Sequence, residues 1–277
     1  MWTDYGSIDQ VIGLVAYYLE EGAQKHRIVG VVDVEEESHT GEIIAAKIEE
    51  VIKKYNIERK VIATVKDGAT NAVLAGKVLE LPHWDCLSRN IHLASEDAIA
   101  AFSGTIDLIS RFKKICRKLK KSSLAQREME ELQCVLELPE LRLKKCANVH
   151  WNFLLDMFER GLKCKAALVL LLDNHKEWPQ ITDQDWNLMA AVCQVLEPLR
   201  RFSIYSQKRG STASTIIPIC KAIIGTIRES NSYPRARIAI VNSLENELAK
   251  YEKVDFLLIA TMTDLRSHSS TFQTRKS

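Results

Sequence analysis

The chain has 277 residues, of which 46% are hydrophobic and 27% charged, values that are typical of folded proteins and allow one large domain or two smaller ones. The longest apolar run, Ala166–Leu172, is too short to span a bilayer, and the opening residues contain no basic segment of the kind that begins a secretory signal. The net charge of +2 hides a division, because residues 1–100 hold 10 basic and 17 acidic side chains while residues 101–277 hold 28 and 19, which indicates two regions with different partners.

The first strands are predicted between residues 10 and 34. Gln10–Leu19 and His26–Val34 are apolar runs rich in β-branched and aromatic residues, and Glu20-Glu21-Gly22 between them is a turn sequence, so we expect a buried hairpin. Thr40 is a suitable N-cap for the helix that follows. The apolar residues of this helix recur at helical spacing as far as Asn56, which predicts that one face of the helix is buried.

A strand, a helix and a strand are predicted next. Val61–Val65 forms the third strand, closed by the turn pair Asp67-Gly68, and Asn71–Leu79 and His83–Leu87 form a short helix and a short fourth strand. This order suits a mixed sheet. The fold class is therefore α/β in a first domain, residues 1–147, and all-α in a second, residues 148–277.

Only helices are expected after about Asn90, since no alternating run appears there. A capping box, Thr182-Asp183-Gln184-Asp185, opens one of them, and Pro198 is expected to kink it. The predicted helices cover 89–121 with a break near Ser103-Gly104, 122–138, 149–172, the segment after Thr182, and segments from Thr212 and Arg235. Two apolar stripes mark their buried faces: Trp151, Leu154, Leu155, Phe158, Leu162, Ala166 and Val169, and then Trp186, Met189, Cys193 and Leu196.

Asp67 is the best candidate acid of the first domain. An acid at the carboxyl end of a strand is where mixed sheets place ligand or metal groups, although Asp-Gly after a strand is also ordinary turn chemistry. Metal-ion chemistry on phosphate needs two or three gathered carboxylates. Spacing alone identifies no second one.

The strongest local charge feature is the run RFKKICRKLKK. It holds seven basic residues and no acid, with Phe112, Ile115 and Leu119 at helical spacing. One apolar and one basic face suit a phosphate-binding helix, because bound phosphates release their counterions; a solvated helix face is the alternative. The basic residues are Arg111, Lys113, Lys114, Arg117, Lys118, Lys120 and Lys121.

Seven cysteines at wide spacings include no C-x-x-C pair, which excludes the common zinc spacings and favours free thiols in a reducing compartment. We expect all of them except Cys86 to be small core residues. The sequence also lacks the dinucleotide, Walker A, HExxH and GxSxG motifs.

Five segments in order together resemble hAT-superfamily transposases of the BED zinc-finger type. In the first, a His-Thr-Gly leads a helix, and a strand ends in Asp67 with Asn71 four residues later. The second carries Cys86, with Arg89 and His92 at positions where the family has His and Asn. The third has His150 in place of Arg before Trp151. The segments are Ser38–Ala72, Trp84–Ile99, Asn148–Leu168, Trp186–Cys220 and Leu257–Leu265.

The resemblance implies an RNase H-like domain interrupted by a helical insertion, with an Asp-Asp-Glu triad and two divalent metals in active relatives. Asp67 corresponds to the second acid of that triad and would ligate metal only in a complete one. The first acid would precede Trp2-Thr3, and the Glu would follow Leu257–Leu265, so we expect a chain truncated at both ends. The resemblance also implies that Trp151 could stack on an unpaired base. The alternative is that Trp151 is a buried core residue.

We therefore expect a transposase-derived, catalytically inactive fragment that binds nucleic acid or protein, and no cofactor; Mg²⁺ or Mn²⁺ is expected only in an intact relative. One alternative is a metal-dependent transposase or nuclease whose other acids lie outside this chain, and a second is a helical scaffold protein. The expected partners are DNA, other proteins, or a second copy through exposed strand edges, with no membrane. The expected location is nuclear or cytoplasmic.

Overall fold

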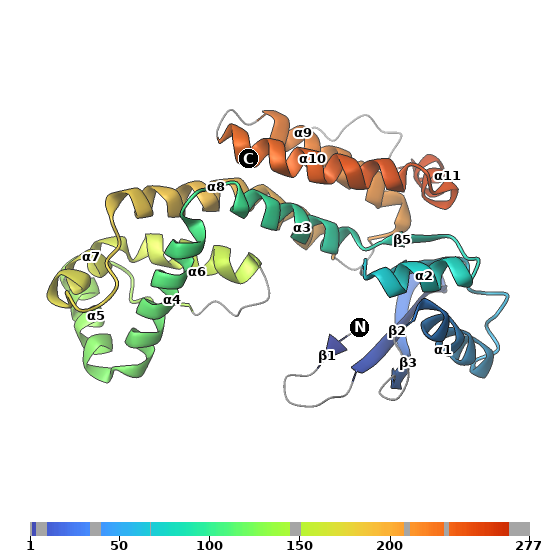
Figure 1. The fold of residues 1–277 in the computed structure, drawn as a ribbon, viewed down its shortest axis with the longest axis horizontal. Helices are drawn as coiled ribbons and strands as arrows, with labels where there is room; N and C mark the ends of the chain where they lie inside the picture. Colours follow the sequence, from blue (N-terminus) through green and yellow to red (C-terminus); the bar gives the residue numbers. More distant parts are fainter. Residues whose placement is uncertain are drawn as a thin grey trace. The chain divides into compact units, whose positions relative to one another are not determined.

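The computed structural model describes residues 2–3, 10–33, 40–66, 68–144, 151–207, 211–229 and 233–265. Two compact units are interleaved along the chain (Figure 1). Unit 1 contains residues 1–90, 205–220 and 247–277, and unit 2 contains residues 91–204 and 221–246. The expected boundary between residues 147 and 148 falls within unit 2 in this division.

The predicted hairpin is confirmed, but the expected burial of both strands was wrong, because only one face of the hairpin is covered. Strand β2 (Gln10–Glu20) pairs antiparallel with β3 (Ala23–Asp33), and the turn between them places Glu21 and Gly22 at φ +52° and +75°, the left-handed values that a two-residue hairpin turn requires. A two-residue strand, β1 (Trp2–Thr3), pairs with the beginning of β2, so the strand order is β1-β2-β3.

Helix α1 (Gly41–Lys54) packs on the hairpin through Ile44 and Ala45, which share a small core with Ile12 of β2. The predicted N-cap is confirmed, because Ile43 N–H donates to Thr40 Oγ1 at 3.4 Å. The helix ends where Asn56 takes φ +52°, a conformation that Asn tolerates. The opposite face of the hairpin leaves large apolar side chains exposed, namely Val15, Tyr17, Leu19, Ile28 and Val31.

The strand expected at Val61–Val65 is present, but it is shorter than predicted and begins three residues later. Strand β4 covers Thr64–Lys66, because Val61 N–H donates to Ile57 O at 3.1 Å in a turn, whereas Thr64 N–H donates to Pro82 O and starts the ladder. After helix α2 (Thr70–Val78), strand β5 (His83–Asp85) runs parallel to β4. The mixed α/β character of the first region is confirmed.

The predicted break near residue 103 is also confirmed. Helix α3 (Leu87–Ala100) ends before Gly104, whose φ of +83° prevents a continuous helix, and α4 (Thr105–Lys121) begins there. Ser122 then caps α5 (Ser123–Val135), with Ala125 N–H donating to its hydroxyl at 3.2 Å.

The helix expected over residues 149–172 is divided into α6 (Trp151–Lys163) and α7 (Lys165–Asn174) at Cys164. The members of the predicted stripe up to Phe158 are buried, but Ala166 and Val169 are exposed. Because the break changes the direction of the chain, α7 buries Ala167, Leu168, Leu171 and Leu172 instead.

Helix α8 (Asp183–Ser206) begins with the predicted capping box and continues through Pro198. Thr182 N–H donates to Asp185 Oδ2 at 2.8 Å, and Asp185 N–H donates to Thr182 Oγ1 at 3.2 Å. The predicted stripe of α8 is buried. Phe112 makes edge-to-face contacts with Phe158 and Trp186, at centroid distances of 6.2 and 6.3 Å, in the core of unit 2.

The last described elements are helices, as expected: η1 (Ala213–Thr215), α9 (Ile216–Glu229), α10 (Pro234–Tyr251) and α11 (Asp255–Thr263). Within unit 1, Ser214 Oγ donates to Asp264 Oδ2 at 2.6 Å. In the portion of the chain that the structure covers, no helix combines the length and apolarity needed to cross a bilayer.

The described cysteines are free, and four of them, Cys116, Cys164, Cys193 and Cys220, are buried as expected. Cys134 is exposed, so its assignment to the core was wrong. Its neighbours Met129 and Gln133 form the buried face of α5, and Cys134 points away from that face.

Candidate nucleic-acid interface

Asp67 and His150 lie outside the described residues, and their roles stay predictions. The residues on either side of Asp67 in the sequence, Lys66 and Gly68, are described. The carboxyl ends of β4 and β5 meet at one edge of the parallel pair, and Asp85 ends β5 there. A Cβ added to Gly68, the residue after Asp67, would lie 3.9 Å from Asp85 Oδ1.

Asp85 is thus a carboxylate close to Gly68, and it was not predicted from the sequence. The available signal was the strand–helix–strand order, since neighbouring parallel strands end at the same edge. Lys66 Nζ lies 3.6 Å from Asp85 Oδ1, so an ammonium group already balances this charge. Among the described residues, no group of three His, Cys, Asp or Glu side chains is placed to hold a metal ion.

The other motif residues occupy different positions around this edge. Asn71 is half-buried in the first turn of α2. Cys86 is half-buried after β5, and its N–H donates to Lys66 O at 2.7 Å, which extends the parallel ladder. Arg89 is exposed on α3, and His92 lies one turn further on, with Nε2 3.4 Å from Glu96 Oε1.

A buried polar network in unit 1 was also not predicted from the sequence. Asn90, which is 3% exposed, donates from Nδ2 to Tyr251 Oη at 2.6 Å and to Glu247 Oε2 at 2.8 Å. Tyr251 Oη in turn donates to Asp85 O at 3.1 Å, and burial raises the pKa of the phenol. The network fixes the end of α10 against the end of β5.

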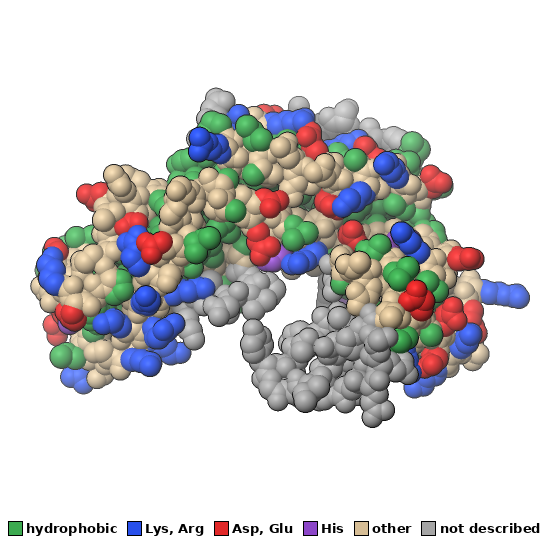
Figure 2. Space-filling model, viewed as in Figure 1, with side chains coloured by type: hydrophobic (Ala, Val, Ile, Leu, Met, Phe, Trp, Pro, Cys, Tyr) green, Lys and Arg blue, Asp and Glu red, His purple; other side chains and the backbone are tan. Residues whose placement is uncertain are grey.

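The basic segment forms most of α4. Its apolar residues Phe112, Ile115, Cys116 and Leu119 are buried in unit 2. The basic side chains that follow Arg111 lie on the other side of the helix, all exposed except the half-buried Lys113. Figure 2 shows Lys and Arg side chains gathered over the end of unit 2 that contains α4 and α5.

Arg111, the first residue of the segment, forms ion pairs within the protein. Its guanidinium donates to both carboxylate oxygens of Asp185, at 2.9 and 2.7 Å, and to Asp107 Oδ2 at 2.7 Å. The pKa of Asp185 is lowered by its hydrogen bonds, and those from Arg111 contribute most. Arg111 therefore connects α4 to the capping box of α8.

Four exposed cations share one face of α4, namely Lys114, Arg117, Lys118 and Lys121, and we call them the cation row. Residues three, four and seven apart in a helix project from the same side. Lys118 Nζ lies 5.3 Å from the Trp178 ring centroid, which holds one member of the row over an aromatic surface. Lys113 and Lys120 flank the row.

Trp151, the remaining candidate, begins α6 and is 6% exposed in the core of unit 2. In this arrangement its indole ring packs against protein and offers no open face to a base. Of the residues predicted to bind nucleic acid, the exposed cations of α4 are therefore accessible from solvent, whereas Trp151 is not.

Comparison with protein-family models gives no match. Three known proteins are similar to the chain. The human zinc finger BED domain-containing protein 4 is 28% identical over 159 residues, which are 56% of this chain and 13% of that protein. The maize putative AC transposase and putative AC9 transposase are each 25% identical over 187 residues, which are 62% of this chain and 23% and 22% of those proteins. The chain thus spans less than a quarter of the length of each relative.

Proposed function

We propose that this chain, a transposase-derived protein of the hAT type, binds DNA through the cation row of α4 and does not cut it. The cation row carries the proposal, because it presents four exposed positive charges along one helix face. The segment from Arg111 to Lys121 itself contains no acid. Contacts of this kind are made with phosphates and give affinity without sequence preference.

The interleaving of the two units supports an RNase H-like domain with a helical insertion. Residues 91–204 and 221–246 of unit 2 lie between segments of unit 1. In unit 1, β1 pairs with β2, and β4 runs parallel to β5. An RNase H-like sheet would place the first strand between β2 and β4.

Access to DNA would require that the protein reach the nucleus.

The proposed lack of cleavage rests on the charges at the carboxyl edge of the sheet. Two metals require several carboxylates that are free to bind them. Asp85, the acid beside Gly68, faces the ammonium of Lys66, and that ammonium competes with a cation for the same oxygen. A metal-dependent nuclease completed by acids outside this chain is the alternative.

We expect no nicking of duplex or transposon-end DNA by the purified chain in Mg²⁺ or Mn²⁺. The measurement is conversion of supercoiled plasmid to the open circle. Nicking that disappears in an Asp67→Ala variant would overturn the proposed inactivity and favour the nuclease.

Binding is tested by charge reversal in the cation row. We expect Lys114→Glu, Arg117→Glu and Lys121→Glu together to weaken binding to a mixed-sequence duplex at least tenfold, because three phosphate contacts become repulsive. Fluorescence anisotropy measures the affinity. Lys118 is retained, since its contact with Trp178 makes it part of the fold.

A matched control separates local charge from net charge. Lys53→Glu, Lys77→Glu and Lys253→Glu change the net charge equally at exposed positions of unit 1. We expect this variant to bind within about twofold of the parent chain. Equal losses in the two variants would show that α4 is not the binding surface.

A further inference from the structure

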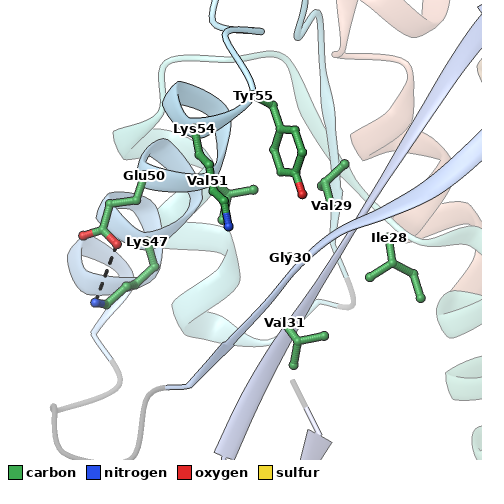
Figure 3. Close-up of a pocket in the computed structure, with 9 residues that line it drawn as sticks. All are labelled: Ile28, Val29, Gly30, Val31, Lys47, Glu50, Val51, Lys54 and Tyr55. Atoms are coloured by element: carbon green, nitrogen blue, oxygen red, sulfur yellow. Dashed lines mark ion pairs between the residues drawn. The ribbon is translucent and has the colours of Figure 1, made fainter.

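A groove with a volume of about 660 Å³ lies between strand β3 and helix α1 in unit 1 (Figure 3). Residues 28–31 form the strand wall, and the helix wall includes Val51, Lys54 and Tyr55. Gly30 makes the close approach of the two walls possible, because a Cβ at this position would lie 3.0 Å from Val51 Cγ2.

The strand wall is an edge of the sheet. In the order β1-β2-β3, strand β3 has β2 on one side, and none of the described strands pairs with its other side. Alternate backbone N–H and C=O groups of an edge strand point away from the sheet and can pair with another chain.

A β-bulge lies within this wall. Leu14 pairs with Gly30 and Val15 with Ile28, so Val29 is an extra residue on β3. Bulges turn side chains out of the regular alternation and are common beside functional sites. The pairing of β3 with β2 is regular from Ala23 to Ile28 and shifts by one residue at Val29, which lines the groove.

The helix wall supplies two cations, Lys47 and Lys54. Lys47 and Glu50 form an ion pair at 3.8 Å, whereas Lys54 has no ion-pair partner within the described ranges; its ammonium lies 5.9 Å from the Tyr55 ring centroid. Tyr55 is 48% exposed. Figure 3 shows both side chains extending from α1 towards β3.

We propose that this groove binds an extended peptide of another protein, which adds as a strand to the edge of β3 that no described strand occupies and places a carboxylate at Lys54. Strand addition obtains affinity from main-chain hydrogen bonds and specificity from alternate side chains. An added strand lies about 4.8 Å from its neighbour, on the side of β3 away from β2. The proposal is independent of the DNA-binding role of α4.

The experiment selects random octapeptides, displayed on phage, for binding to the immobilised full chain, and then measures the selected peptides by fluorescence anisotropy. We expect sequences with alternating β-branched residues and an Asp or Glu. Lys54→Glu should weaken their binding at least tenfold. Lys53→Glu is the matched control, since Lys53 pairs with Glu49 at 3.5 Å and does not line the groove; it should change binding less than twofold.

A second test addresses the backbone pairing. N-methylation of alternate amides in a selected peptide should abolish binding in one register and leave it unchanged in the other, because only one set of amides faces β3. The proposal is overturned if no peptide is enriched, if both lysine variants bind alike, or if neither methylated series loses affinity. It is also overturned if the free chain sediments as a dimer that Val31→Lys dissociates, since a second copy would then occupy the edge.

Discussion

Arg111 shows how one residue of a basic run can serve the fold while its neighbours remain available for binding. Its guanidinium is 26% exposed, and the Asp185 carboxylate that it contacts is 12% exposed. A pair with this burial leaves an uncompensated charge when one partner is removed. The sequence places Arg111 among the phosphate-binding candidates, but its contact with Asp185 is 74 residues away along the chain.

We expect Arg111→Ala to lower the free energy of unfolding by about 2–4 kcal/mol, since it removes the cation that pairs with the carboxylate of Asp185. Lys114→Ala, which removes an exposed cation three residues later, should change the free energy by less than about 0.5 kcal/mol. Urea denaturation measures both. Similar values for the two variants would mean that the ion pair is not structural.

His175 forms the second residue-scale feature, a proton-dependent contact within unit 2. Its Nε2 lies 2.8 Å from Glu128 Oε2, its Nδ1 lies 3.3 Å from Glu177 Oε1, and its ring stacks on Trp178 at 4.8 Å. The hydrogen bond to Glu128 is the main cause of the raised pKa of His175, and hydrogen bonds from Asn174 and then His175 lower the pKa of Glu128.

The folded state therefore holds the imidazolium proton more tightly than the unfolded state. Its stabilisation is complete below the unfolded pKa of about 6.5 and is lost as the pH rises through the higher folded value. The Glu128 contribution is present above the unfolded pKa of about 4.3 and is lost as the pH falls. The contact is strongest between these limits.

We expect His175→Phe, which keeps an aromatic ring on Trp178, to lower the melting temperature by about 2–4 °C near pH 5.5, the shift that corresponds to about 1 kcal/mol. The difference from the parent chain should shrink above about pH 8. Scanning calorimetry between pH 5 and 9 measures it. A difference that stays constant with pH would show that the charge of His175 contributes nothing.

At the scale of the elements, two glycines within helices have opposite surroundings. A Cβ on Gly161 of α6 would lie 2.5 Å from Cζ of Phe112, a fully buried ring, whereas a Cβ on Gly225 of α9 meets no atom within 4 Å. Gly161 therefore allows α6 to pack closely on α4. Gly225 has no such packing role.

We expect Gly161→Ala to destabilise the protein by about 1–3 kcal/mol or more, as overpacking does in a rigid core. Gly225→Ala should stabilise it by about 1 kcal/mol, because Ala favours a helix interior. Thermal unfolding of the two variants is the measurement. The packing would be misassigned if Gly161→Ala also raised the melting temperature.

Local sequence signals predicted most of the elements. The hairpin, the Thr40 cap, the break at Gly104 and the capping box at Thr182 each depend on neighbouring residues, and each was found. The break at Cys164 was not predicted, because the nearest glycine, Gly161, lies inside α6 and no Pro follows it before α7. The apolar residues on both sides fit a single helical period until the chain turns there.

Tertiary contacts account for what the sequence did not indicate at the site. Asn90 and Tyr251 are 161 residues apart, yet they share a hydrogen bond, and no periodic pattern connects them. Asp85 lies near Gly68 only because β4 and β5 are parallel neighbours. The basic face of α4 could be predicted from the sequence, since charge periodicity is local. The contact of Arg111 with Asp185 could not be predicted, because the two residues are 74 positions apart.

At the scale of the whole chain, the basic and acidic regions support different proposals. The cation row lies in unit 2, and the groove beside β3 lies in unit 1. A DNA-binding surface and a peptide-binding surface on separate units would allow one protein to connect the two kinds of partner. The peptide selection and the DNA measurements test these surfaces independently.

The salt dependence of DNA binding tests the central claim most directly. Each phosphate contact contributes about 0.9 to the slope of log affinity against log salt concentration, so four cations predict a slope of about −3 to −4 for the parent chain. Reversal of Lys114, Arg117 and Lys121 should reduce its magnitude to about 1 or less, while the unit 1 control keeps the parent slope. Equal slopes for the parent chain and the α4 variant would contradict binding through the cation row.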